Sequence, residues 1–73
     1  MISKILAIIN KVKDNKADEL LEVINVNTKL REDCGFDSLD LAELTVRVER
    51  EFGIDIFANG NINTVREILE QIK

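Results

Sequence analysis

The sequence predicts an all-α fold, a small bundle of three main helices with a short additional helix and a long first loop. Apolar residues recur at spacings of three and four in three separate segments, which is the rhythm of amphipathic helices. A strand is conceivable over residues 22–26, but no second convincing strand could pair with it, so we expect no sheet. With 73 residues and no repeat, the chain is expected to be one domain over residues 1–73, near the lower size limit for an independent core.

The first helix is predicted over residues 2–14. Ile2, Ile5, Leu6 and Ile9 follow the spacing of one helical face, and the pair Asp14-Asn15 favours a stop. This segment is too short and too interrupted by polar residues to span a bilayer.

A long connection follows over residues 15–36, and in so small a domain it should contain structure of its own or be functional. Residues 18–22 are expected to form a short turn of helix. Four apolar residues are expected to anchor the loop to the core: Val23, Ile24, Val26 and Leu30.

The second helix is predicted over residues 38–52. Asp37 is a preferred N-cap residue, and Asp40 stands at the third helical position, where a capping-box acid would be. Gly53 follows as a C-cap glycine. Glu43, Arg47 and Glu51 lie four apart on the outer face of this helix, where opposite charges can pair.

We expect this helix to bury a broad face and to be the central packing element. Two apolar lines run along it. The first consists of Leu41, Leu44, Val48 and Phe52, and the second of Leu39, Ala42 and Val46.

Beyond Gly53, the apolar Ile54, Ile56 and Phe57 should return to the core, and a short helix is expected between residues 56 and 62. Thr64 and Glu67 match the S/T-x-x-E capping box, so a final helix should begin there. Its apolar stripe is Val65, Ile68, Leu69 and Ile72.

The composition excludes several kinds of chemistry. Histidine, tryptophan and tyrosine are absent and Cys34 is the single cysteine, which rules out histidine acid–base catalysis, a Cys/His metal site and a disulfide framework. No paired acids or activated cysteine suggest an enzyme. Cys34 is expected to be a small, partly buried apolar side chain beside the turn.

The net charge of −4 lies entirely in the second half of the chain. Residues 1–36 carry six acidic and six basic side chains, whereas residues 37–73 carry eight acidic and four basic ones. An acidic surface argues against nucleic acid and anionic membranes as partners and favours proteins with basic patches. The start of the chain lacks the organisation of a signal peptide, so we expect a cytoplasmic, soluble monomer without membrane insertion.

Ser38 is the candidate functional residue. It follows the flexible Gly35 and the cap Asp37, in the first turn of the predicted helix, where free backbone amides tolerate a phosphate on or near the hydroxyl. The ordinary alternative is a serine that merely starts a helix, and D-S-L alone would not decide against it.

Residues 32–52, EDCGFDSLDLAELTVRVEREF, resemble the acyl carrier protein family. The resemblance centres on D-S-L-D and on the E-x-E-F ending at Phe52, and it continues through residues 53–56 and Thr64-Val65. It covers essentially the whole chain in the order and length of its elements.

The resemblance implies that Ser38 accepts a 4′-phosphopantetheine arm from coenzyme A through a separate phosphopantetheinyl transferase. The arm's thiol would then hold acyl intermediates as thioesters and deliver them to partner enzymes in fatty acid or related acyl biosynthesis. Asp37 would help present the serine and contact the transferase. Partner docking, to acyl-transferring, condensing or modifying enzymes with basic patches, would involve Asp40, Glu43, Arg47, Arg50 and Glu51.

The resemblance also suggests residues that could surround a bound acyl chain. These are Leu30, Leu41, Leu44, Thr45, Val48, Ile56 and Ile62. The alternative for each apolar residue among them is plain core packing.

The pathway stays open at the level of sequence. Arg47 and Arg50 interrupt a helix face that is commonly acidic in members serving fatty acid synthesis. A dedicated carrier of a polyketide, lipopolysaccharide or aminoacyl pathway is therefore an alternative. So is an unmodified acidic helical module that binds a basic partner.

Overall fold

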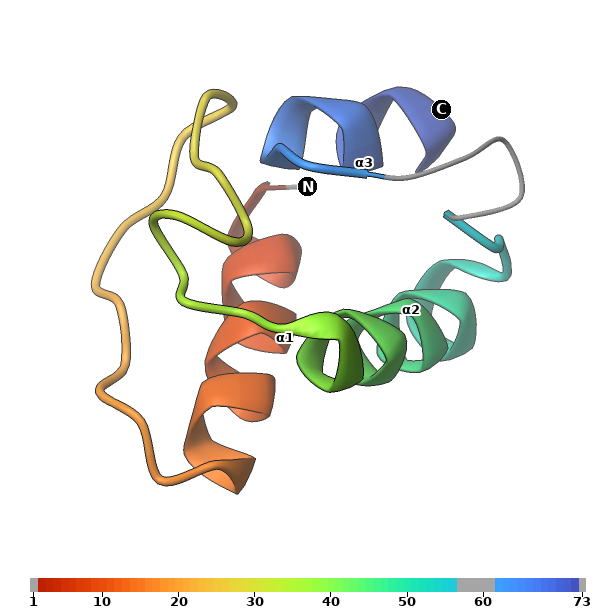
Figure 1. Ribbon diagram of the computed structural model, residues 1–73. Helices are drawn as coiled ribbons and strands as arrows, with labels where there is room; N and C mark the ends of the chain where they lie inside the picture. The colour runs from red at the N-terminus through yellow and green to blue at the C-terminus, as the bar shows by residue number, and fades with distance from the viewer. Residues whose placement is uncertain (1, 57–61, 73) are drawn as a thin grey trace.

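The computed structural model describes residues 2–56 and 62–72 and shows three helices in those residues, α1 (Ile2–Asn15), α2 (Ser38–Phe52) and α3 (Val65–Ile72). Figure 1 shows α2 lying across α1 and α3 lying over the opposite side of the core, with the long first loop running down one flank of α1. The all-α prediction is confirmed, and the second helix has the predicted bounds.

The core lies between the three helices and the loop. Ile5, Ile9 and Val12 from α1 meet Leu44 and Val48 from α2. Residues of α3 and of the loop close the remaining sides, namely Val65, Ile68, Ile24, Leu30, Cys34 and Phe36. Burying apolar area of this kind is the main stabilising contribution in a chain this small.

The loop is fastened to the start of α3 by main-chain hydrogen bonds. The Leu30 amide donates to the Asn63 carbonyl at 2.7 Å, the Val65 amide to Thr28 at 3.0 Å, and the Arg66 amide to Val26 at 2.9 Å. The last two occupy amides that a helix N-terminus would otherwise leave unsatisfied. The short bridge between Lys29 and Thr64 is isolated, and no strand forms within the described residues.

The C-terminal end of α2 and the N-terminal end of α3 are capped as the sequence predicts. Gly53 takes a left-handed conformation with φ 74° and its amide donates to the Glu49 carbonyl at 2.7 Å. At the start of α3 the Glu67 carboxylate accepts from the Asn63 and Thr64 amides, both at 2.9 Å, which confirms the predicted capping box.

The predicted helical turn over residues 18–22 is wrong. No helical turn forms there, because the Asn10 amide group on α1 both donates to the Leu21 carbonyl and accepts from the Leu21 amide, each at 2.8 Å. Leu21 therefore uses its backbone groups for α1 and not for a local turn.

Two predicted packing roles are also wrong. Ile24 and Leu30 anchor the loop and Val26 is half-buried, but Val23 is 77% exposed. On α2 the line through Leu41, Leu44 and Val48 is buried, and the second predicted line is not.

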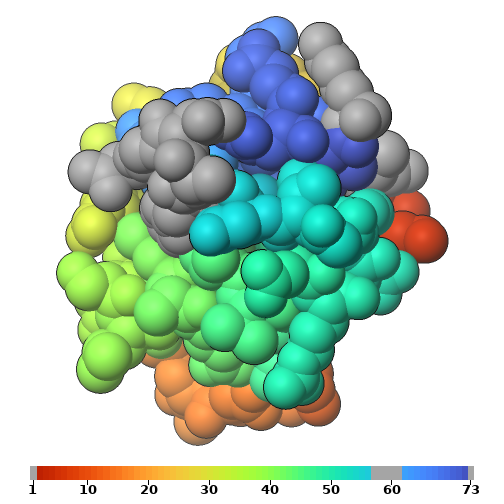
Figure 2. Space-filling view, turned by 90° about the vertical axis from the view of Figure 1, so that its right-hand side faces the viewer, coloured from red at the N-terminus to blue at the C-terminus, as the bar shows by residue number. Residues whose placement is uncertain are grey.

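In that second line Leu39 is 81% exposed, Val46 is 48% exposed and Ala42 is also exposed. α2 packs on α1 through its other apolar line, so nothing in the described residues covers this face. The space-filling view in Figure 2 looks onto a side of the molecule where α2 fills the middle, between α3 above and the end of α1 below.

The short helix predicted between residues 56 and 62 falls largely on residues 57–61, outside the described residues. Its flanking residues Ile56 and Ile62 are both buried, at 0% and 5% exposure.

Candidate functional site

The start of α2 is built from a capping box. The Asp40 amide donates to the Asp37 carboxylate at 3.0 Å, and the Asp37 amide donates to the Asp40 carboxylate at 3.0 Å. Gly35 precedes them with φ 74°, a left-handed conformation that glycine adopts without strain. These two features turn the chain sharply from the loop into the helix and fix where its first residue lies.

Ser38 is that first residue, and it is exposed. Within the described part of the chain its hydroxyl makes no hydrogen bond, and neither do the amides of Ser38 and Leu39. An unengaged hydroxyl beside free amides at the positive end of a helix dipole suits a phosphoester on the serine. The residues present therefore fit a phosphate-linked group at this position.

Two lysines hold the turn in place, Lys13 in the last turn of α1 and Lys16 directly after that helix. Lys13, which is only 5% exposed, donates to the Cys34 carbonyl at 2.8 Å and pairs with Asp18 at 3.1 Å. Lys16 donates to the Gly35 carbonyl at 3.3 Å and pairs with Asp40 at 2.6 Å. Lys13 thus joins α1 to the loop before Ser38, and Lys16 joins that loop to Asp40 of α2.

The charged groups of the site shift each other's titration. The hydrogen bond from Lys16 holds the pKa of Asp40 below its ordinary value, and the Asp37 amide adds to this effect. The same contact raises the pKa of Lys16. Both groups therefore remain charged around neutral pH.

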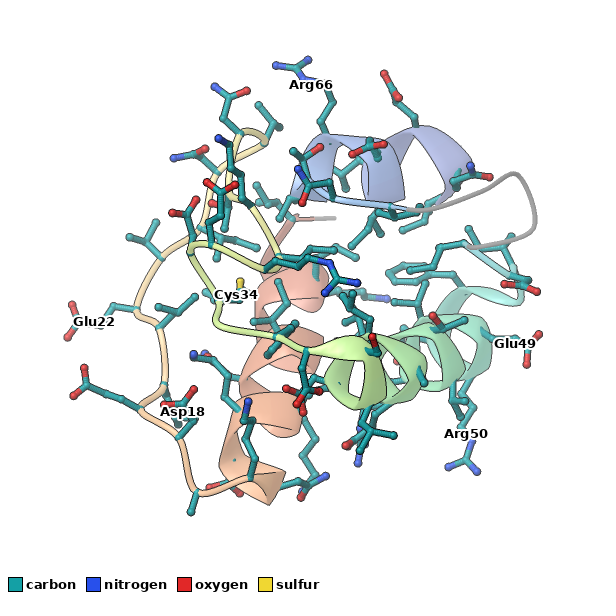
Figure 3. The ribbon with its side chains drawn as sticks, viewed as in Figure 1. Asp18, Glu22, Cys34, Glu49, Arg50 and Arg66 are labelled. Atoms are coloured by element: carbon teal, nitrogen blue, oxygen red, sulfur yellow. The ribbon has the colours of Figure 1, made fainter. Side chains whose placement is uncertain are left out.

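Cys34 lies inside the molecule, as predicted, with 1% exposure, and Figure 3 shows its sulfur between the loop and α1. Burial raises the pKa of its thiol, so it remains protonated and is an inert packing residue.

The predicted docking residues are distributed over two places. Asp40 belongs to the capping box and Glu43 accepts from Asn15 at 2.7 Å and from Arg47 at 2.8 Å. The Asn15 hydrogen bond and the Arg47 ion pair lower the pKa of Glu43. Arg50 and Glu51 lie far from Ser38, in the last turn of α2, and Figure 3 shows Arg50 pointing away from the ribbon.

The predicted acyl-pocket residues are brought together, but as a closed core. Six of them belong to one buried cluster, Leu30, Leu41, Leu44, Val48, Ile56 and Ile62. Thr45 is half-buried, and its hydroxyl donates to the Leu41 carbonyl at 2.9 Å. A cavity lined by none of these residues lies between α1 and α2.

Lys13 and Lys16 are not among the predicted site residues. Basic residues at or just beyond the C-terminal end of a helix interact favourably with the helix dipole, so both lysines resemble ordinary solvated end residues. Their partners are 21 and 24 residues away in the chain, and no local spacing indicates such contacts.

Within residues 2–56 and 62–72, no group of three or more histidine, cysteine or acidic side chains could hold a metal ion. None of the helices described is long and apolar enough to cross a membrane. The site offers one exposed nucleophilic oxygen and a rigid helix start, which suits a residue that is modified by another protein.

Comparison with known proteins gives a consistent result. Residues 3–72 match the family model described as phosphopantetheine attachment site. The chain is 37% identical over 67 residues to an acyl carrier protein of Aster yellows witches'-broom phytoplasma, covering 85% of this chain and 88% of that relative.

Two further relatives are matched over a shorter length. An acyl carrier protein of Trieres chinensis is 42% identical over 52 residues, 68% of this chain and 65% of the relative. One of Rickettsia bellii is 37% identical over 49 residues, 67% of this chain and 56% of the relative, so the chain spans little more than half of that protein. No solved structure matches the chain.

The family model covers nearly the whole chain, including the capped turn and the exposed Ser38. The chain therefore belongs to the acyl carrier protein family, whose members are non-catalytic carriers with a phosphopantetheine attachment site.

Proposed function

We propose that Ser38 carries a covalent 4′-phosphopantetheine arm and that the chain, as a single carrier domain and a monomer, delivers acyl groups to partner enzymes of acyl biosynthesis. The observation that carries this proposal is the exposed, unbonded Ser38 hydroxyl at the first position of a rigidly capped helix. The family match over residues 3–72 supports it.

In the attachment reaction, the Ser38 oxygen forms a bond to the phosphorus of coenzyme A that bears the pantetheine. The bond from that phosphorus to the nucleotide's phosphate oxygen breaks, and the serine proton passes to a base. A separate phosphopantetheinyl transferase is proposed to supply that base and the metal, since no group of three or more histidine, cysteine or acidic side chains among the described residues could hold a metal ion. Once attached, the arm supplies a terminal thiol that holds acyl groups as thioesters.

The chain's own residues position the acceptor. The reciprocal bonds between Asp37 and Asp40 keep Ser38 at the first helical position, and the free amides of Ser38 and Leu39 can donate hydrogen bonds to the phosphate oxygens. Asp37 is proposed to contact the transferase as well as cap the helix.

The chain contains two serines, Ser3 and Ser38, which makes the test sharp. We expect incubation with coenzyme A and a broad-specificity transferase to add the mass of one arm to the wild type and to Ser3→Ala. Ser38→Ala should gain none. A folded wild type that gains no mass would overturn the carrier proposal and favour an unmodified acidic interaction module.

The pathway alternative is a dedicated carrier for a polyketide, lipopolysaccharide or aminoacyl system. It is favoured by Arg50, an exposed cation on the helix that would face partner enzymes, and by Arg47 beside it. If the arginines select the partner, Arg47→Glu with Arg50→Glu should raise turnover with general fatty acid synthase enzymes. Unchanged turnover would remove this argument for a dedicated carrier.

A further inference from the structure

A groove lies between α1 and α2, with a volume of about 560 Å³. Residues at helical spacing line it from both sides. α1 contributes Lys4, Ala7, Ile8 and Lys11, and α2 contributes Arg47, Arg50 and Glu51.

The groove has a positive charge on a protein whose net charge is −4. Four of the chain's ten lysines and arginines line it, against the single acidic residue Glu51. Lys4 pairs with Glu51 at 3.4 Å and the Arg47 Nε pairs with Glu43 at 2.8 Å. Lys11 and Arg50 are exposed and have no ion pair among the described residues, so their charges remain available to a ligand.

The shape of the groove limits what can occupy it. Lys4 and Lys11 are seven residues apart on α1, or about 10.5 Å along the helix axis, so the groove presents its cations at separate positions along its length. Ala7 and Ile8 lie between them and give the groove an apolar floor. A matching ligand is elongated, with anionic groups about 10 Å apart and an apolar group between them.

A protein segment fits this description better than a membrane does. A bilayer is flat and would have to approach a surface whose remaining charge is acidic, including Asp37 and Asp40 at the other end of α2. Carboxylates on one face of a helix or strand can reach the cations while an apolar side chain fills the floor.

We propose that this groove is a docking surface for an acidic segment of a partner protein. It is separate from the attachment site, because Ser38 begins α2 and Arg50 lies in its last turn, about 18 Å further along the axis. The groove does not include Ser38, so its binding can be tested on the unmodified chain.

The test is an NMR titration of the ¹⁵N-labelled full chain with a designed helical peptide. The peptide carries glutamates at the seven-residue spacing of Lys4 and Lys11, with leucines between them. We expect saturable shifts of the amides of residues 4–11 and 47–51, weaker at high salt because exposed charges are screened. A peptide with glutamine in place of glutamate should not bind.

Two charge-matched variants locate the effect. Lys11→Glu with Arg50→Glu should weaken peptide binding at least about tenfold, since both available cations are reversed. Arg31→Glu with Arg66→Glu changes the net charge equally at exposed positions outside the groove and should bind like the wild type. The neutral pair Lys11→Gln with Arg50→Gln, which preserves solubility and helix propensity, should fall between them.

Three results would overturn the proposal. Equal weakening in both charge-reversed variants would indicate unspecific attraction. Shifts of the same amides by citrate at the peptide's affinity would indicate a small-anion site. Binding of anionic phosphatidylglycerol vesicles through residues 4–11, with no peptide binding, would indicate a membrane surface.

Discussion

The Lys16 ammonium lies 2.6 Å from the Asp40 carboxylate and 3.3 Å from the Gly35 carbonyl, which joins α1 to both sides of the turn that presents Ser38. Asp40 uses the same carboxylate oxygen to accept from the Asp37 amide at 3.0 Å. Its side chain is 13% exposed, so the predicted docking residue is largely committed to holding the helix start.

Lys16→Gln is expected to raise the pKa of Asp40. The hydrogen bond from Lys16 is the largest cause of the lowered pKa, and a neutral amide at that position stabilises the carboxylate less. A ¹³C NMR titration of the carboxyl groups measures this pKa directly. Lys4→Gln serves as the control, because its partner is Glu51, and an unchanged Asp40 pKa in Lys16→Gln would contradict the assigned cause.

The protein is expected to lose stability in acid. The pKa values of Asp40, Glu43 and Glu67 are all held below their ordinary values of 3.8, 4.5 and 4.5. A lowered folded-state pKa contributes stability that is present above the unfolded-state pKa and is lost as pH falls through the folded-state one.

Urea unfolding at a series of pH values tests this expectation. The free energy of unfolding should stay level near neutral pH and fall below about pH 5, where the unfolded carboxylates begin to take up protons. Glu67→Gln should make the fall shallower, because its carboxylate accepts from the Asn63 and Thr64 amides. A free energy that rises on acidification would contradict the linkage.

Lys13→Met is expected to destabilise the protein by about 1–3 kcal/mol. Methionine keeps the buried chain of Lys13 but removes the donor to the Cys34 carbonyl, leaving a buried acceptor without that bond. Urea denaturation measures the loss. Lys29→Met is the comparison, since its partner Glu32 is exposed and the pair should contribute less than about 1 kcal/mol.

The start and end of α2 could be predicted from sequence because the responsible contacts are local. Asp37 and Asp40 are three residues apart, and Gly53 follows the helix directly. The hydrogen bonds from Lys13 to the Cys34 carbonyl and from Lys16 to the Asp40 carboxylate could not be predicted, because they depend on how α1 lies against the turn.

The exposed line on α2 shows a second limit of the sequence pattern. Apolar spacing predicts which residues share a face but not whether another element covers it, and α2 meets α1 along only one of its two apolar lines. Leu30, Leu41 and Ile56 are buried core residues in the structure. Plain core packing, the alternative to an acyl pocket, therefore describes their positions.

Leu39 and Leu44 give the last expectation, a test of which apolar line of α2 is buried. Leu44 is fully buried, so Leu44→Ala should cost about 2–5 kcal/mol through lost contacts and a cavity. Leu39 is 81% exposed, so Leu39→Gln, which keeps a similar helix propensity, should change the free energy of unfolding by less than about 0.5 kcal/mol. Denaturant unfolding of both variants measures the contrast, and a comparable loss in Leu39→Gln would mean that this leucine is covered in solution.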